Sequence, residues 1–339
     1  MDRPRDRRQA SRQELKRNLL PLLGLIGLVF AVALLPAGVL WFFGGVGVGS
    51  GSGGDGSGTS PAKAGGAAGS SIRGGASERP DDITFESGDA VLAGDLILPE
   101  GSGPFPAVVA VHGSGRSTRR VMRRVAEALV PRGFAVLIYD KRGVGRSSGL
   151  YSGVGPANSE HMLGLLAQDA LAGVRLLASH PRIDRARIGL VGVSQAGWII
   201  PKAASQSPLV AFAVIVSGPT VTVGEEIYYS DLTGDDAGRP TTLTDEEIQE
   251  RLARYQGPDG FDPLPSLRIM KAPTLWLLGE KDRSIPIPEC LAHLDELIEQ
   301  GQPFRYKVYP GANHGLRLPD GTRIDYWDEV EGFIRETWE

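Results

Sequence analysis

Ser194 stands in the segment Ile-Gly-Leu-Val-Gly-Val-Ser-Gln-Ala-Gly, residues 188–197, whose residue types suit nucleophilic chemistry. An apolar run typical of a β-strand leads into Gly192, and small residues follow the serine before an apolar, helix-like stretch. A serine on such a sharp strand-to-helix turn is exposed, and the first N–H groups of the helix can stabilise an oxyanion beside it. The segment therefore predicts a serine that attacks an acyl carbonyl group.

A serine hydroxyl of this kind needs a histidine to take its proton and a carboxylate to orient that histidine. His314 lies in Gly311-Ala-Asn-His-Gly315, a short loop expected between the last strand and the last helix. Asp282 follows another strand-like run and precedes the histidine in chain order, as in one known arrangement of such triads. Glu280 is an alternative but stands too close to the strand, and Glu289 falls inside the next expected helix.

An oxyanion formed at the serine needs two hydrogen-bond donors. We expect one from the backbone N–H of Gln195, directly after the nucleophile, and one from Ser114 in His112-Gly-Ser-Gly115. Small residues in that loop allow its backbone to approach a substrate, and His112 is expected to hold the loop by hydrogen bonding. No cluster of His, Asp or Glu has metal-ligand spacing, so the chemistry predicted is free of metals and cofactors.

Apolar runs alternate with amphipathic stretches, which predicts an α/β protein with a mostly parallel sheet and helices on both faces. The strand-like runs cover residues 83–87, 91–98, 107–112, 134–140, 187–193, 210–216, 273–279 and 304–309. The helix-like runs cover residues 119–131, 160–179, 195–206, 289–300 and 323–338. In such sheets, the carboxyl ends of the strands meet at one edge, where the three candidate residues would come together.

Residues 218–269 interrupt this alternation and are interpreted as a cap over the site; a surface insertion without a role is the alternative. Thr244-Asp-Glu-Glu247 has the pattern of a helix-capping box. Tyr228 and Tyr229, together with Trp198 of the preceding helix, are candidates for lining a pocket.

The amino-terminal residues predict a membrane anchor. Residues 1–18 carry a net charge of +4. Residues 19–43 contain no charged side chain, and this segment is long enough for one transmembrane helix. Residues 44–77 hold 14 glycines and 7 serines and are expected to form a disordered linker. The basic segment would stay in the cytoplasm and the following domain would lie outside the cell membrane; secretion after signal cleavage is the alternative.

Residues 78–339 form the predicted catalytic domain and carry a net charge of −9. An acidic domain argues against nucleic acid as a partner. Cys290 is the only cysteine, so no intrachain disulfide can form, and its helical setting favours a packed residue over a nucleophile. The partners expected are therefore a small-molecule acyl ester and the membrane.

Several motifs together resemble the α/β-hydrolase superfamily, and in particular the bacterial esterase-like branch related to serine aminopeptidases and dipeptidyl-peptidase-like hydrolases. The matching segments are His112–Gly115, Tyr139–Ser148, His180–Asp184, Gly192–Gly197, Gly279–Asp282 and Gly311–His314. Ala196 departs from the family pattern, which has glycine there, but alanine is nearly as small. The resemblance implies an α/β-hydrolase fold and ester hydrolysis. In the second segment, Asp140 and Arg142 are expected to pair and to brace the oxyanion loop.

Two other functions remain open at this point. A peptidase or an acyltransferase could use the same scaffold, and a peptidase would gain from an acidic subsite for a substrate amine. The acidic residues of the cap that could supply such a subsite, or only a solvated surface, are Glu225, Glu226, Asp231, Asp235 and Asp236. A non-catalytic surface binding protein is the third possibility, although it has no need of Asp282 and His314 at their positions.

Overall fold

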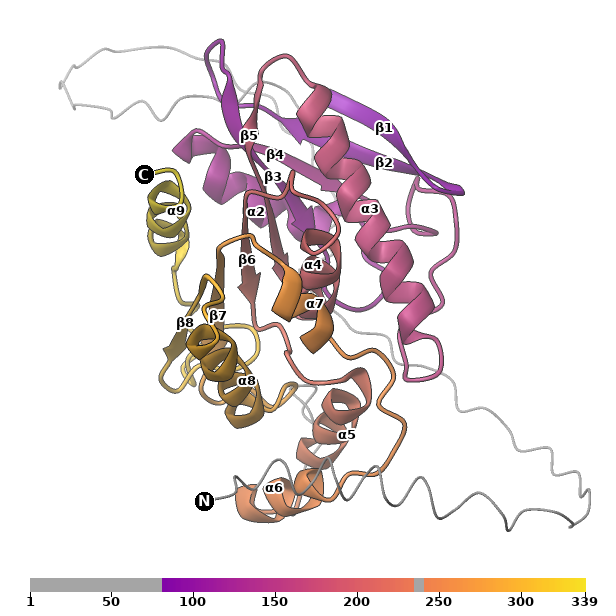
Figure 1. The fold of residues 1–339 in the computed structure, drawn as a ribbon, viewed down its shortest axis with the longest axis vertical. Helices are drawn as coiled ribbons and strands as arrows, with labels where there is room; N and C mark the ends of the chain where they lie inside the picture. The colour runs from indigo at the N-terminus through magenta and orange to yellow at the C-terminus, as the bar shows by residue number, and fades with distance from the viewer. Residues whose placement is uncertain (1–80, 235–240) are drawn as a thin grey trace, which may run out of the picture. The chain divides into compact units, whose positions relative to one another are not determined.

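One eight-stranded sheet forms the centre of residues 81–234 and 241–339, which are the residues that the computed structural model describes (Figure 1). The strand order is β1-β2-β4-β3-β5-β6-β7-β8. β1 and β2 form an antiparallel hairpin, β2 pairs antiparallel with β4, and all other neighbours are parallel. The strands are β1 (Asp81–Ser87), β2 (Ala90–Ile97), β3 (Phe105–Val111), β4 (Ala135–Tyr139), β5 (Ile183–Val193), β6 (Phe212–Val216), β7 (Thr274–Gly279) and β8 (Phe304–Tyr309).

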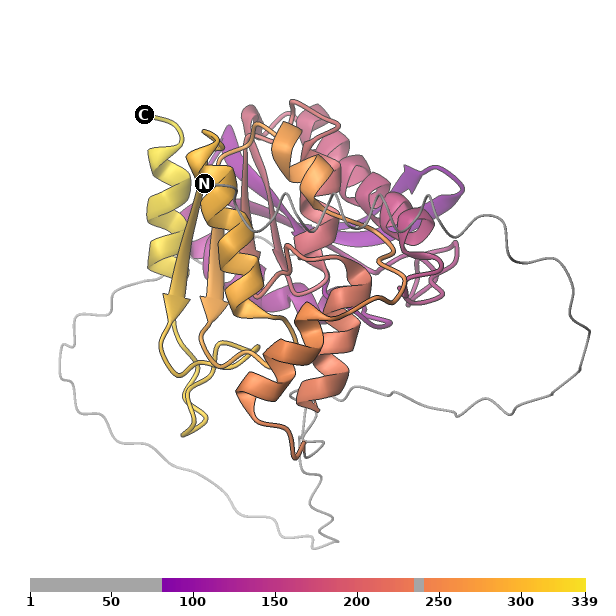
Figure 2. The same cartoon turned by 60° about the horizontal axis from the view of Figure 1, so that its bottom comes forward.

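Helices cover both faces of this sheet, as the alternating sequence predicts (Figures 1 and 2). One face is covered by α3 (Ser159–Ser179), α4 (Ala196–Ala204) and α8 (Ile287–Glu299). The other face is covered by α2 (Arg123–Leu129) and α9 (Trp327–Glu336). The α/β-hydrolase fold expected from the sequence is confirmed by this architecture.

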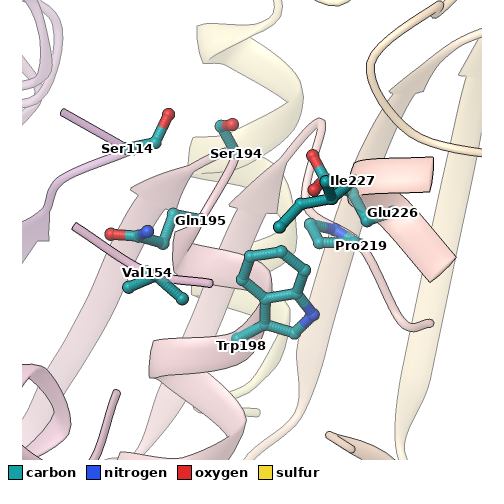
Figure 3. Close-up of a pocket in the computed structure, with 8 residues that line it drawn as sticks. All are labelled: Ser114, Val154, Ser194, Gln195, Trp198, Pro219, Glu226 and Ile227. Atoms are coloured by element: carbon teal, nitrogen blue, oxygen red, sulfur yellow. The ribbon is translucent and has the colours of Figure 1, made fainter. Parts of the chain in front are cut away.

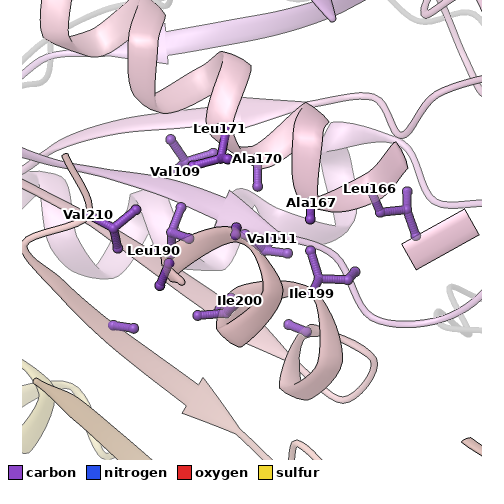
Figure 4. Packing of buried hydrophobic residues seen from close by; sticks show 14 of the residues in the cluster. Val109, Val111, Leu166, Ala167, Ala170, Leu171, Leu190, Ile199, Ile200 and Val210 are labelled. Atoms are coloured by element: carbon purple, nitrogen blue, oxygen red, sulfur yellow. The ribbon is translucent and has the colours of Figure 1, made fainter. Parts of the chain in front are cut away.

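The central strands β3, β4, β6 and β7 are mostly apolar because both of their faces are buried. Side chains alternate along β3, so that Val109 and Val111 join the cluster under α3 and α4, whereas Val108 and Ala110 join the cluster under α2. Figure 4 shows the first cluster, with Val109 near Leu171 of α3 and Val111 near Ile199 of α4.

Two helices are shorter than the sequence pattern indicates. The run at 119–131 is divided into the 3₁₀ turn η1 (Arg119–Met122), α2 and the 3₁₀ turn η2 (Val130–Arg132). The last helix begins at Trp327 instead of residue 323, because Pro319-Asp-Gly321 forms a turn that pairs Arg317 with Arg323. Gly321 has a φ of 84°, which favours glycine, and the turn extends the loop that follows β8.

The predicted cap contains three helices, α5 (Val223–Thr233), α6 (Asp245–Ala253) and α7 (Leu264–Ile269). The capping box expected at Thr244 is present, and a second one begins α5 at Thr222. Figure 1 shows α5 and α6 beyond the arrowheads of the central strands, which is the edge where the candidate site residues lie.

Within the described residues, only α3 has the length and composition of a membrane-spanning helix. Most of its side chains are buried against the sheet and α4, so it serves as a core helix here. The basic segment predicted at residues 1–18, the transmembrane helix predicted at 19–43 and the linker predicted at 44–77 lie outside the described residues.

Candidate active site

Ser194 occupies a strained turn between β5 and α4. Its φ of 53° is in the left-handed region that non-glycine residues rarely adopt, and its N–H donates to the Val216 carbonyl at 2.8 Å. The turn is possible because its neighbours are small: a Cβ on Gly192 would lie 2.4 Å from Ala196 Cβ. A Cβ on Gly197 would lie 2.6 Å from the Gly218 carbonyl carbon, so only glycine lets α4 approach the loop after β6 this closely.

The structure brings the serine, the histidine and the aspartate of the sequence analysis into one hydrogen-bonded chain. His314 Nε2 lies 3.0 Å from Ser194 Oγ, and His314 Nδ1 lies 2.8 Å from Asp282 Oδ2. The other carboxylate oxygen of Asp282 accepts the N–H groups of Ser284 and Ile285 at 2.8 and 3.0 Å. Because these bonds fix the buried carboxylate, the imidazole is held with one nitrogen toward the serine.

The loops that carry the aspartate and the histidine are bound to each other. The N–H of Lys281 donates to the Ala312 carbonyl at 2.8 Å, and Glu280 Oε2 accepts the N–H of Gly311 at 2.8 Å. A Cβ on Gly279 would lie 2.4 Å from the Asn313 carbonyl oxygen, so the end of β7 requires glycine to admit the histidine loop. Glu280 thus contacts the backbone of that loop, and Asp282 contacts the imidazole.

The cap is connected to the same loops. The Tyr229 hydroxyl of α5 donates to the Asp282 carbonyl at 3.2 Å, and the Thr233 hydroxyl donates to the Arg283 carbonyl. The Arg283 guanidinium in turn donates to the Thr233 carbonyl at 3.0 Å. The position of α5 is therefore set by the loop after β7 that carries Asp282.

A cavity of about 170 Å³ opens beside Ser194, between the serine turn and α5 (Figure 3). Its lining residues are Ser114, Val154, Ser194, Gln195, Trp198, Pro219, Glu226 and Ile227. Trp198 is fixed there because its indole N–H donates to the Val221 carbonyl at 2.9 Å. Half of the lining residues are apolar, and Glu226 contributes the one carboxylate among them, at the cap side.

Two of the three aromatic residues expected in the pocket lie elsewhere. Trp198 lines the cavity, but Tyr229 is buried with the cap residues Ile248 and Leu252, and Tyr228 packs against Tyr255. Tyr229 lies one helical turn from Glu226 on α5, but its hydroxyl donates to the Asp282 carbonyl and its ring packs inside the cap. Tyr228 points to the far side of the helix. The sequence does not reveal which face of a short cap helix is turned inward.

The two expected oxyanion donors both lie next to the serine (Figure 3). Ser114 and Gln195 both line the cavity, and a Cβ on Gly113 would lie 3.4 Å from Ser194 Cβ. Within the described ranges, neither the Ser114 N–H nor the Gln195 N–H donates to another protein group. Both are therefore available to an oxygen atom bound at the serine.

The charged residues after β4 pair differently from the expectation. Asp140 and Arg142 do not form an ion pair with each other. Asp140 accepts from the buried Arg119 at 3.2 Å, and Arg142 makes two 2.8 Å bonds to the buried carboxylate of Asp169 on α3. The chain leaves the sheet after Tyr139, and the fold supplies a separate partner for each of the two side chains.

Lys141, between these two residues, escaped the sequence analysis. Its ammonium group is buried and donates to the carbonyls of Gly113 and Gly115 in the oxyanion loop. The signal for it was a lysine directly after an apolar strand, where burial is expected. His112, at the start of the same loop, packs edge-on against Tyr139 and is hydrogen bonded to the Tyr139 backbone. Burial lowers the pKa of His112 to about 3, so its imidazole is neutral.

The other histidines and Cys290 are not part of this chain of groups. His293 lies 2.9 Å from the Thr220 carbonyl, and His180 accepts the N–H of Arg182. Burial raises the pKa of Cys290 to about 12. Among residues 81–234 and 241–339, no group of three or more His, Cys, Asp or Glu could hold a metal ion.

The fold and its strand order define an α/β-hydrolase, and comparison with known proteins identifies the family. A model of the prolyl oligopeptidase family matches residues 121–338, so the chain belongs to that family of serine hydrolases. Its relatives include esterases, peptidases and an acyltransferase.

The similarity to individual relatives is distant. Over 285 residues the chain is 27% identical to esterase EstD of Thermotoga maritima, covering 74% of this chain and 66% of the esterase. It is 25% identical to the acylamino-acid-releasing enzyme of Rattus norvegicus, covering 70% of this chain and 32% of that enzyme. The chain thus spans about one third of the length of the acylamino-acid-releasing enzyme and about two thirds of the length of the esterase.

Solved structures support the fold. The esterase Pf2001 of Pyrococcus furiosus superposes with a TM-score of 0.57 at 20% identity, covering 77% of this chain and 92% of that one. DcsB, in a complex with its substrate analogue, gives a TM-score of 0.56 at 21% identity, covering 76% of this chain and 99% of that one.

Proposed function

We propose that this protein is a membrane-anchored carboxylic ester hydrolase in which Ser194, His314 and Asp282 form the catalytic triad. The observation that carries the proposal is the hydrogen-bonded chain from Ser194 Oγ through both imidazole nitrogens to the buried Asp282 carboxylate. Two free backbone N–H groups, of Ser114 and Gln195, stand beside the serine as the oxyanion donors. The similarity to an esterase supports ester chemistry.

The reaction would follow from these positions. Ser194 Oγ attacks the acyl carbonyl carbon while its proton passes to His314 Nε2, and the carbonyl oxygen gains negative charge between the two N–H groups. His314 then gives the proton to the departing alcohol oxygen, leaving an acyl-serine. A water molecule repeats the sequence, with His314 accepting its proton, and releases the carboxylic acid. Asp282 keeps the imidazole in the required tautomer throughout.

The size of the cavity favours short acyl groups. A volume of about 170 Å³ holds about six groups of methylene or water size, at about 30 Å³ each. Val154, Trp198 and Ile227 offer an apolar surface to such a chain. We therefore propose esters with acyl chains of about four to six carbons as the preferred substrates.

Substitution of the serine tests the proposal. Ser194→Ala should lower the turnover of p-nitrophenyl butyrate by about 10⁶-fold and abolish labelling by a fluorophosphonate, because it removes the hydroxyl that is hydrogen bonded to the imidazole. Ser217→Ala is the matched control, since Ser217 is a serine that also has a positive φ and directly follows the adjacent strand β6, but it is buried. It should turn over the ester like the wild type. Wild-type activity in Ser194→Ala would overturn the assignment.

Glu226 favours a second candidate, hydrolysis of amides that carry a cationic amine. Its carboxylate lines the cavity beside the serine, and the acylamino-acid-releasing enzymes are relatives. The test is to compare kcat/KM on aminoacyl p-nitroanilides with kcat/KM on p-nitrophenyl esters of the same acyl group. A higher kcat/KM on the amide, lost in Glu226→Gln, would establish the second candidate in place of the first.

Membrane anchoring rests on the uncharged segment 19–43 and the basic residues before it. In cell fractionation, the full chain should remain with the membrane after alkaline carbonate washing. Placing charges at the centre of the segment, as in Ile26→Asp with Phe30→Arg, should release it, because each charge opposes insertion by about 3 kcal/mol. Recovery of the unaltered chain in the soluble fraction would contradict the anchor.

A further inference from the structure

Lys141 is the middle one of three consecutive buried charged residues, and unlike its two neighbours it forms no ion pair with another described residue. Its neighbours Asp140 and Arg142 are paired with Arg119 and Asp169. Within the described part of the chain, no carboxylate lies within ion-pair distance of the Lys141 ammonium, although its side chain is only 1% exposed. A buried and unpaired ammonium is expensive, so its position calls for a reason other than stability.

The ammonium contacts the two residues that flank Ser114 and the side chain of Gln195, so it borders both of the proposed oxyanion donors. It donates to the Gly113 carbonyl at 2.6 Å and to the Gly115 carbonyl at 3.0 Å, on either side of Ser114. It also lies 3.3 Å from the side-chain oxygen of Gln195. One cation thus connects the donor loop after β3 with the first residue after the nucleophile.

The peptide between Gly113 and Ser114 shows what the first of these bonds does. In a trans peptide the C=O and N–H bonds point in opposite directions within one plane. Because Lys141 holds the Gly113 oxygen, the Ser114 N–H of the same peptide is directed away from the ammonium. A cation on the carbonyl also polarises that peptide, which strengthens the N–H as a donor.

Tyr151 completes the enclosure of the ammonium. The Lys141 nitrogen lies 4.3 Å from the centre of its ring, a distance at which an aromatic face stabilises a cation. The Tyr151 hydroxyl is hydrogen bonded to the Gln195 side chain and to the backbone of Gly115. The ring therefore covers the cation and holds both of the elements that the cation connects.

We propose that Lys141 is a positioning residue of the oxyanion hole: through the Gly113 and Gly115 carbonyls and the Gln195 side chain, it directs the Ser114 N–H toward the reacting oxygen. Lys141 itself does not touch the substrate. The inference depends on the proposed function, because it assumes that an oxyanion forms at Ser194.

The role predicts a selective effect on substrates whose oxygen accepts those hydrogen bonds. An ester places a carbonyl oxygen in the oxyanion hole, whereas the matching thionoester places sulfur there, which is a weak acceptor. Lys141→Met keeps the length of the side chain and removes its donors. We expect its kcat on p-nitrophenyl butyrate to fall by about 10- to 100-fold, less than the loss of a donor itself. KM and the thionoester rate should change little.

The ratio of ester to thionoester kcat/KM is therefore the decisive readout, because a general loss of structure would lower both rates. Lys202→Met is the matched control: Lys202 is a partly buried lysine that, like Lys141, lies above an aromatic ring, that of Phe261, but it pairs with Glu160. It should keep the wild-type ratio. An unchanged ratio in Lys141→Met would overturn the proposal.

A measurement on the wild type covers the case in which Lys141→Met does not fold. Burial lowers the pKa of Lys141 to about 7, opposed by the negative charge of Asp169. The other charged or titratable groups around it are His112, Tyr151, Asp140 and Arg142. The ester-to-thionoester ratio of kcat/KM should fall between pH 7 and 9.5, since a neutral lysine donates less strongly. Both substrates need His314 equally, so any change in its protonation affects both rates alike and leaves the ratio unchanged. A constant ratio would refute the role.

These results separate the two proposals. If Ser194→Ala retains activity, the proposed function fails. If Ser194→Ala is inactive and the ratio is the same in wild type and Lys141→Met at every pH, only the role of Lys141 fails.

Discussion

Replacing Lys141 with methionine should make the stability of the protein less dependent on pH. The buried ammonium has its pKa lowered from 10.5 to about 7, chiefly by desolvation. In the folded protein the proton is lost near pH 7, whereas the unfolded chain keeps it up to about pH 10.5. Between these values the unfolded state binds more protons, so the free energy of unfolding of the wild type rises with pH.

The magnitude follows from the shift. Each pH unit in this window changes the free energy of unfolding by about 1.4 kcal/mol, and below pH 7 the full penalty of the buried charge is about 5 kcal/mol. Lys141→Met removes the penalty but leaves the Gly113 and Gly115 carbonyls without their donor, at about 1–3 kcal/mol each. Those lost bonds set the offset between the two proteins and not its pH dependence.

Urea unfolding of the full chain in mild detergent, followed by tryptophan fluorescence from pH 6 to 9.5, measures this difference. The stability of Lys141→Met relative to the wild type should be constant below pH 7. It should then decline by about 1.4 kcal/mol per pH unit. Lys202→Met should show no such slope. Parallel curves for Lys141→Met and wild type would refute the assignment of a buried, charged lysine.

Two further predictions concern the cavity and the core. Trp198→Leu enlarges the cavity, so the preferred p-nitrophenyl ester should shift to longer chains, with about a fourfold gain in kcat/KM for each methylene that newly fits; an unchanged chain-length profile would contradict the assigned acyl site. Asp169→Asn removes the buried carboxylate partner of Arg142, leaves it only the exposed Asp89, and should lower the free energy of unfolding by about 3 kcal/mol. The double variant Asp169→Leu with Arg142→Met should recover most of that loss of unfolding free energy, as measured by chemical unfolding. If the effects of the two single substitutions simply add, the two side chains are not coupled.

The order of elements was accessible from the sequence because both faces of the central strands are buried. Continuous apolar runs such as Val108–Val111 indicate that condition directly. Helix ends were less accessible: the turn at Pro319–Gly321 replaces the first part of the helix expected from residue 323. Local turn chemistry there outweighs the periodicity of the apolar residues.

The positions of Ser194, Asp282 and His314 were also inferable one by one, because each follows a strand and parallel strands end at the same edge. Their distances of 3.0 and 2.8 Å depend on contacts between loops that are far apart in sequence. The close approach at Gly279 is an example: the need for glycine there is visible only once the histidine loop is seen against it.

The sequence by itself thus determined the layered α/β architecture and the candidate nucleophile, base and acid, because local patterns encode strands, helices and the loops that follow them. Only the tertiary structure decided which side chains reach one another. It paired Asp140 with Arg119 instead of Arg142, turned Ile227 and not Tyr228 toward the cavity, and placed Lys141 against the oxyanion loop. Pairings across the chain depend on the direction of each side chain and on packing, which no single segment contains.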